Sequence, residues 1–344
     1  MKKIVTLGEL LLRLSAPGHE RFFQSPNFEA TFSGSEANIA CELAQLGNRA
    51  SYVTAVPDNA IGEAALSEVR KYDVDLSTVI RKDGRIGIYF LETGAYRRPS
   101  NVVYDRENSC IAEALPSDFD WEAVFADASW FHISGITPAV SENAYRTTIE
   151  AIAQAKKRNI TVSFDINYRA KLWRYGRRAE DAVKEIVKSA DVLITNEGHI
   201  RFCLGITVPG YDTSKEGLPD EYFEKISLAV KREYPNIHTV ALTRRRTYTS
   251  DVNDFSALLH DKNGTFFVSK KYHIENIVDR VGGGDAFAAG LIHGFHHFED
   301  TQYTLDFATA AASFKHTIPG DIAIFRKGEL ESLVEGETTG SIRR

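Results

Sequence analysis

The chain has 344 residues, of which 43% are hydrophobic and 26% are charged. A disordered or fibrous protein is therefore excluded, and the length suits one large α/β domain with a small appendage, or two ordinary domains. The formal net charge of -6 excludes a general attraction to nucleic acid or to an acidic membrane surface.

We expect neither a membrane-spanning segment nor a secretion signal. No apolar run approaches the roughly 20 residues that span a bilayer, and the first residues lack the apolar segment of a signal peptide. Cys41, Cys110 and Cys203 are widely spaced and form no C-x-x-C pair, which indicates neither a disulfide framework nor a zinc site. We therefore expect a soluble, cytoplasmic protein.

The first part of the chain predicts a parallel sheet interrupted by a small β-layer. We expect a strand at 3–7, a helix at 36–46, a strand at 51–56 and a helix at 62–69. Segments at about 11–33 and 86–110 instead predict strands with no helices between them. Such strands favour a small sheet inserted into the larger domain.

Four further buried strands are expected, at 130–134, 161–165, 192–195 and 239–243, each after a helical segment. This alternation is typical of βαβ units. Polar residues stand at or just after the strand ends, among them Asp165, Asn167, Asn196 and Thr243. Because ligands bind at the carboxyl ends of such strands, we expect these side chains to meet in one cleft. The last residues, 337–344, predict a frayed end.

The most informative segment contains three consecutive glycines, Gly282, Gly283 and Gly284, followed by Asp285 and a helix of small residues. Backbone N–H groups at such a helix start can cradle an anion. Asp285 alone could be a simple helix N-cap. Beside an anion hole, however, its carboxylate can accept a hydroxyl proton during phosphoryl transfer. The P-loop motif G-x-x-x-x-G-K-[ST] is absent.

Two motifs carry a resemblance to a known family. The run 279–287 resembles the C-terminal signature D-x-x-G-[AG]-G-D-x-F of the PfkB, or ribokinase-like, carbohydrate kinases, and the stretch 32–40 resembles their N-terminal signature. The resemblance extends from the first strand to about Leu333. It implies a three-layer α/β/α fold with a mostly parallel central sheet, formed by a single kinase domain over 1–344 whose β-sheet lid comes from about 11–33 and 86–110.

The resemblance also implies roles for individual residues. Asp285 would be the catalytic base, the three glycines the anion hole, and Gly34 and Asn38 contacts to sugar hydroxyls. ATP would be bound by Asn167, Asn196, Thr243 and Arg244, together with Gly282 and Gly284. Without the second motif, Gly34 and Asn38 would be equally well explained as a turn glycine and a polar residue at a helix start.

Within the family, the segments 165–173, 250–257 and 315–321 are most similar to the 2-keto-3-deoxygluconate kinases. Such an enzyme forms 2-keto-3-deoxy-6-phosphogluconate. Because this sugar acid carries a carboxylate, an arginine at a strand end can bind it with paired hydrogen bonds. Arg169 is the first candidate, with Arg106, Tyr104 and Tyr89 from the lid strands as further contacts.

Two departures from the family pattern affect the nucleotide side. After the strand expected at 192–195, the family carries the motif N-x-x-E. Here the motif begins at Asn196, and His199 stands at its final position. Arg244, Arg245 and Arg246 replace a glycine-rich turn, and they would either grip phosphates or form a solvated turn. Mg²⁺ is implied by ATP chemistry; its protein ligands and any monovalent-cation requirement stay open.

Exposed lid edges favour a homo-oligomer formed through the lid. Several alternatives to the sugar acid kinase also remain. One is a kinase for a neutral sugar such as fructose or ribose, and another is a sugar-binding regulator without catalysis. A Rossmann dehydrogenase is disfavoured because no G-x-G-x-x-G follows the first strand.

Overall fold

The computed structural model describes residues 2–213 and 217–337. All but the first residue of the predicted frayed end at 337–344 therefore lies outside the described residues. None of the described helices is both long and apolar enough to cross a membrane.

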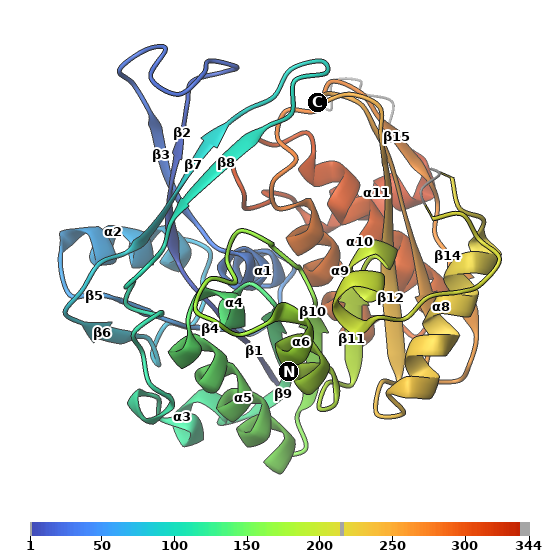
Figure 1. Ribbon diagram of the computed structural model, residues 1–344, viewed down its shortest axis with the longest axis horizontal. Helices are drawn as coiled ribbons and strands as arrows, with labels where there is room; N and C mark the ends of the chain where they lie inside the picture. Colours follow the sequence, from blue (N-terminus) through green and yellow to red (C-terminus); the bar gives the residue numbers. More distant parts are fainter. Residues whose placement is uncertain (1, 214–216, 338–344) are drawn as a thin grey trace.

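A large mixed sheet forms the centre of the molecule (Figure 1). Its order is β14-β13-β12-β11-β10-β9-β1-β4, and β15 also pairs with β13. The six neighbouring strands β4, β1, β9, β10, β11 and β12 are parallel. Strand β13 runs antiparallel to β12, and β14 and β15 run antiparallel to β13. The strands are β1 Lys3–Leu7, β4 Ala50–Val53, β9 Ala128–Ser134, β10 Thr161–Asp165, β11 Val192–Thr195, β12 Thr239–Thr247, β13 Asn253–His260, β14 Phe266–Val268 and β15 Tyr272–Ile274.

Helices cover both faces of this sheet because the buried strands are apolar on both sides. Along β9, for example, Phe131 packs into the core on one face and Trp130 into the core on the other. One face is covered by α3 Trp121–Phe125, α5 Glu142–Lys157, α6 Ala179–Val187 and α8 Asp220–Glu233. The other is covered by α1 Ser35–Gln45, α2 Ala60–Arg70, α9 Gly283–His297 and α10 Thr301–Lys315. The remaining α-helices of the described chain are α4 Thr137–Val140, α7 Glu197–His199 and α11 Lys327–Glu335.

A second, four-stranded sheet projects from this body (Figure 1). We call it the small sheet, and its order is β3-β2-β7-β8. Its strands are β2 Leu11–Ser15, β3 Glu29–Ser33, β7 Gly87–Glu92 and β8 Asn101–Asp105. One face packs on the body, where Val281 of the glycine-containing loop packs against the cluster of Leu11, Tyr89 and Leu91.

The three-layer α/β/α prediction, with a mostly parallel sheet and a small second sheet, is confirmed. The single strand expected at 51–56 is wrong. The chain forms β4 in the large sheet and then β5 Ala55–Pro57, which pairs with β6 Ile80–Lys82 in a separate two-stranded sheet. The change of partner occurs at Thr54, whose carbonyl accepts a hydrogen bond from the Ile80 N–H; a continuous apolar run carries no sign of it.

Candidate active site

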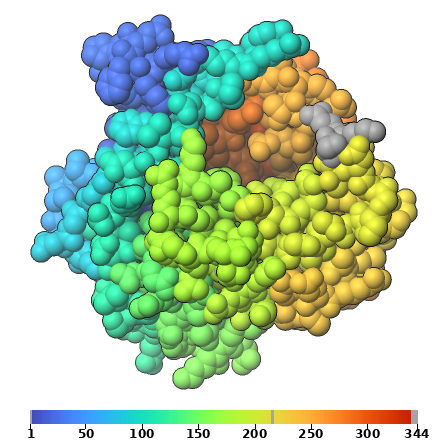
Figure 2. All heavy atoms as spheres, in the orientation of Figure 1, coloured from blue at the N-terminus to red at the C-terminus, as the bar shows by residue number. Residues whose placement is uncertain are grey.

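A cavity of about 400 Å³ lies between the small sheet and the carboxyl ends of β10, β11 and β12, with the start of α9 in its wall. Figure 2 shows the surface hollowed at this place. The cavity brings together nearly all the residues predicted for substrate and nucleotide. These are Gly34, Asn38, Tyr89, Tyr104, Arg106, Asn167, Arg169, Asn196, Thr243, Gly282, Gly283, Gly284 and Asp285.

Asp285 lies in the first turn of α9 and is only 8% exposed. Its Oδ1 accepts a hydrogen bond from the Ser35 hydroxyl at 2.6 Å, and its Oδ2 accepts one from the Asn38 amide at 2.7 Å. Burial raises the pKa of Asp285 to about 6, although the two hydrogen bonds act in the opposite direction. A carboxylate with this pKa is mostly ionised at neutral pH and is suited to accept a proton.

Two of the three glycines before Asp285, Gly282 and Gly284, meet different local demands. Gly282 has a φ of 85°, and a Cβ there would lie 1.9 Å from the carbonyl oxygen of Asp321, so only glycine fits. A Cβ at Gly284 would meet no protein atom within 4 Å, because this residue faces the cavity. Packing within the protein therefore does not explain Gly284, whereas close approach of a ligand to the backbone does.

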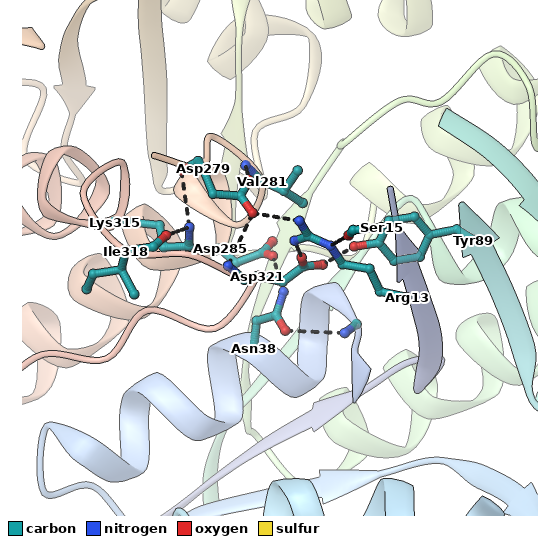
Figure 3. Close-up of polar contacts among 12 residues, drawn as sticks. Arg13, Ser15, Asn38, Tyr89, Asp279, Val281, Asp285, Lys315, Ile318 and Asp321 are labelled. Carbon is teal, nitrogen blue, oxygen red and sulfur yellow. Dashed lines mark hydrogen bonds and ion pairs between the residues drawn. The ribbon is translucent and has the colours of Figure 1, made fainter. Parts of the chain in front are cut away.

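Gly34 and Asn38 are tied to internal contacts. A Cβ at Gly34 would lie 2.0 Å from the carbonyl oxygen of Glu9, so the fold itself demands a glycine there. Asn38 accepts a hydrogen bond from the Gly34 N–H at 3.2 Å through its Oδ1, while its Nδ2 binds Asp285. Figure 3 shows the Asn38 amide directed at that carboxylate. Asn38 thus orients Asp285, and its predicted contact to a sugar hydroxyl stays a prediction.

The residues predicted to bind the substrate carboxylate differ in how far they are engaged within the protein. Arg106 forms a buried ion pair with Glu9 at 2.6 Å, and the Tyr89 hydroxyl donates to Asp321 at 2.5 Å. Tyr104 has the Arg106 guanidinium 5.6 Å from its ring centre. Arg169 is exposed, and its guanidinium donates a hydrogen bond to the main-chain oxygen of Tyr168 at 3.1 Å. Of the two arginines, Arg106 is paired with a carboxylate of the protein, whereas Arg169 has no carboxylate partner among the described residues and can therefore pair with an anionic ligand.

Arg169 belongs to a group of three arginines that line the cavity, with Arg245 and Arg280. Arg245 is open to solvent because the cavity is open, yet the surrounding protein still desolvates it. That desolvation, followed by the charges of Arg280 and Arg169, lowers the pKa of Arg245. Arg280 donates to two main-chain oxygens and to Asn253. Within residues 2–213 and 217–337, none of the three forms an ion pair with a carboxylate. We call them the arginine cluster and expect it to attract an anion.

The structure does not bring Arg244 into this cavity. Successive residues of a strand point to opposite faces, so Thr243 and Arg245 of β12 face the cavity while Arg244 faces away. The Arg244 guanidinium instead pairs with Asp220 at 2.5 Å and lies 5.3 Å from the ring centre of Phe223. Arg244 was expected among the residues of the nucleotide site, but the side chain of β12 that lines this cavity is Arg245.

Asn167, Asn196 and Thr243, which the sequence predicts as nucleotide contacts, all line the cavity. Asn196 caps α7 by accepting the His199 N–H at 2.9 Å. Burial and the charges of Arg169 and Arg245 lower the pKa of His199 to about 4, so this residue is neutral where the family has an acid. In the described part of the chain no three His, Cys, Asp or Glu side chains gather as a metal site.

Several residues at the site were missed from the sequence. Ser35 directly follows the predicted Gly34, and only the fold reveals that its hydroxyl reaches Asp285, 250 positions away. Arg280 lies inside the C-terminal signature but at a variable position of the motif. Asp321 lines the cavity from a loop after α10; in the sequence, the run 315–321 indicates only a resemblance to the 2-keto-3-deoxygluconate kinases.

A three-layer α/β/α fold with a buried carboxylate at a glycine-rich helix start defines a carbohydrate kinase. The chain belongs to the pfkB family carbohydrate kinases, whose family model matches residues 1–326.

Several relatives match over nearly their full length. The chain is 31% identical, over 98% of both chains, to a 2-dehydro-3-deoxygalactonokinase of Haloferax volcanii. Its structure is similar to that of a 2-dehydro-3-deoxygluconokinase of Thermotoga maritima, with a TM-score of 0.91 and 44% identity over 97% of this chain and 98% of that chain. A pfkB family carbohydrate kinase of Listeria grayi gives a TM-score of 0.89 and 33% identity over 97% of this chain and 100% of that chain.

Proposed function

We propose that this protein transfers the γ-phosphoryl group of ATP to 2-keto-3-deoxygluconate and forms 2-keto-3-deoxy-6-phosphogluconate. The observation that carries the proposal is that one cavity contains both a buried carboxylate and a group of arginines. Asp285 and the glycine run lie on one wall, and the arginine cluster, which has no carboxylate ion-pair partner among the described residues, lines the same cavity. A kinase for a sugar acid needs a base for a hydroxyl and positive charge for phosphates and a carboxylate.

The proposed chemistry assigns one step to each part. Asp285 accepts the proton of the attacking hydroxyl, and the N–H groups at the start of α9 stabilise charge on the transferred phosphoryl group. Arg245 and Arg280 bind phosphates, and Arg169 binds the substrate carboxylate through charge-assisted hydrogen bonds. Asn167, Asn196 and Thr243 contact the nucleotide from the ends of neighbouring strands.

Mg²⁺ is expected to arrive with ATP. This ion usually keeps several waters and binds substrate phosphates through few protein ligands, which suits a chain whose described residues form no three-ligand site. When bound, it would neutralise phosphate charge. A monovalent-cation requirement and a cytoplasmic location stay predictions.

A second substrate is 2-dehydro-3-deoxygalactonate, because the Haloferax volcanii relative is named for it. The two sugar acids share the carboxylate and differ in the configuration of one hydroxyl group. A neutral sugar such as fructose or ribose is disfavoured, since it offers nothing anionic to Arg169.

We further propose that the small sheet acts as a lid that keeps water from the acceptor hydroxyl. Residues of β7 and β8 line the cavity together with residues of the body, which supports this role. The outer strand β3 is largely exposed. Because exposed sheet edges tend to be covered by pairing, we propose a homo-oligomer formed through the small sheets.

The test is a direct measurement of ADP formed with a panel of 2-keto-3-deoxy sugar acids and neutral sugars, for the wild type and Asp285→Asn. We expect turnover with the sugar acids, and a fall in kcat of about 10²- to 10⁴-fold for the variant. Asp300→Asn is the matched control, because Asp300 caps α10 outside the cavity and asparagine is an equally good cap. Faster turnover of a neutral sugar, or near wild-type turnover in Asp285→Asn, would contradict the proposal.

A further inference from the structure

Arg13 lies on β2 of the small sheet and is only 5% exposed. Each of its three guanidinium nitrogens has a partner. Nη2 pairs with Asp279 at 2.7 Å, Nη1 pairs with Asp321, and Nε donates to the Ser15 hydroxyl at 2.7 Å. Figure 3 shows the guanidinium between the two carboxylates, which belong to the body of the molecule.

The two acids lie on either side of the glycine run. Asp279 accepts the Val281 N–H at 3.0 Å through Oδ1, and its Oδ2 accepts the Gly320 N–H at 3.2 Å. Asp321 lies with its carbonyl oxygen where a Cβ of Gly282 would be. Asp279 is therefore bonded to the backbone at Val281, and the main chain of Asp321 packs against Gly282.

Other contacts from the small sheet reach the same loop. Tyr89 is the register partner of Arg13 on β7, and its hydroxyl donates to the second oxygen of Asp321. Val281 packs against the apolar cluster that Leu11, Tyr89 and Leu91 form on the small sheet. The inner face of the small sheet thus contacts the loop that leads into the glycine run 282–284, the proposed anion hole.

Stability alone gives a weak reason for this arrangement. A buried ion pair is often no more stabilising than apolar residues of similar volume, because the charges must be desolvated. Burial would lower the pKa of Arg13, but the charges of Asp321 and Asp279 raise it, so the guanidinium stays charged. A planar guanidinium does hold two carboxylates at fixed places, which a flexible apolar chain cannot do.

We propose that Arg13 is a positioning residue for phosphoryl transfer, holding the glycine run in register with the small sheet through Asp279 and Asp321. This inference rests on the proposed role of the glycine run in binding the transferred phosphoryl group. It predicts that catalysis depends on a residue of the small sheet that does not line the cavity.

The experiment compares Arg13→Gln with Arg85→Gln. Arg85 also pairs with a carboxylate of the small sheet, Asp105, but at an exposed place away from the glycine run. Per folded molecule, we expect kcat of Arg13→Gln to fall by about 10- to 100-fold, the cost of a small displacement of catalytic groups, while the KM values change little. Hydrogen exchange of the amides 281–284 should become faster in the same variant. Arg85→Gln should change neither quantity.

Arg13→Lys keeps the charge but cannot bridge both carboxylates, so it should recover part of kcat and covers the case in which Arg13→Gln fails to fold. A purely structural role would lower the melting temperature and leave kcat per folded molecule and the exchange of 281–284 unchanged; that result would overturn the inference. If Asp285→Asn loses turnover while Arg13→Gln and Arg13→Lys retain it within about twofold, the inference is wrong and the proposed function stands. If the wild type phosphorylates no sugar acid, the proposed function is wrong, and the exchange measurement alone decides whether Arg13 holds the glycine run.

Discussion

Removing the Ser35 hydroxyl should shift the pH dependence of the reaction. Its hydrogen bond to Asp285 at 2.6 Å, like that of Asn38 at 2.7 Å, stabilises the ionised carboxylate. Burial acts in the opposite direction and, as the largest cause, raises the pKa to about 6. In Ser35→Ala one of the two opposing contacts is lost, so the pKa of Asp285 rises further and the base becomes protonated at a higher pH.

The size of this shift follows from the hydrogen bond. A hydrogen bond to a charged group contributes about 1.5 to 3 kcal/mol, and one pH unit corresponds to about 1.4 kcal/mol. The acid limb of kcat/KM should therefore move up by about 1 to 2 pH units. At pH 6 the variant would be about 5- to 50-fold slower than the wild type. Well above both limbs, the two enzymes should react at similar rates, since the base is then ionised in each.

The measurement is kcat/KM for the sugar acid from about pH 5 to 9, with product detected directly so that no coupling enzyme contributes. Phosphate groups titrate near pH 6 as well, so the criterion is the displacement of the limb rather than its presence. Ser313→Ala is the matched control, because that hydroxyl donates to the Thr309 carbonyl within α10. A Ser35→Ala limb at the wild-type pH would refute the assignment of Asp285 as the titrating base.

Three other predictions test different parts of the site. Arg245→Gln should lower kcat/KM for ATP by at least about tenfold, the loss of one charge-assisted hydrogen bond, whereas Arg244→Gln should not; steady-state kinetics that give equal effects would contradict the strand orientation. Gly284→Ala should melt no lower than the wild type, since its Cβ meets no protein atom within 4 Å and alanine favours helices, yet it should lose kcat/KM because the methyl occupies space needed by phosphate; a fully active variant would exclude close backbone approach there. Light scattering should detect an oligomer, and a monomer at every working concentration would exclude pairing through the small sheets.

The parts of the site that the sequence predicted are those whose meaning is local. Three glycines before a helix favour an anion-binding backbone through local geometry alone, so 282–285 could be interpreted without any knowledge of distant contacts. The ends of β10, β11 and β12 could be grouped for a similar reason, because parallel strands in one sheet end at the same edge. Both inferences need only the order of the elements.

The sequence did contain the information that separates Arg244 from Arg245. Thr243 is expected to face the cleft, and side chains alternate along a strand, so Arg245 faces the cleft as well if the strand continues past Thr243. The strand expected from the sequence ends at Thr243, so alternation could not be applied to Arg244 and Arg245. The antiparallel pairing of β12 with β13 extends it to Thr247, and that pairing depends on residues farther along the chain.

The contacts of Arg13 could not be predicted from the sequence. Asp279 lies 266 residues and Asp321 lies 308 residues further along the chain. A lone arginine in a short alternating strand is usually solvated, and nothing nearby distinguishes it. Only the packing of the small sheet on the body brings its guanidinium to Asp279 and Asp321.

The electrostatics of the cavity explain why the acidic and basic groups occur together. Burial raises the pKa of Asp165 and Glu36 to about 7 and that of Asp285 to about 6. A raised folded-state pKa means that each group favours folding at low pH and that this contribution is lost as pH rises through about 6 to 7. The protein thus carries unfavourable buried charge in the pH range where its base must be ionised. Arg169 lowers the pKa of both Asp285 and Asp165, so part of the arginine cluster offsets the charge that catalysis requires.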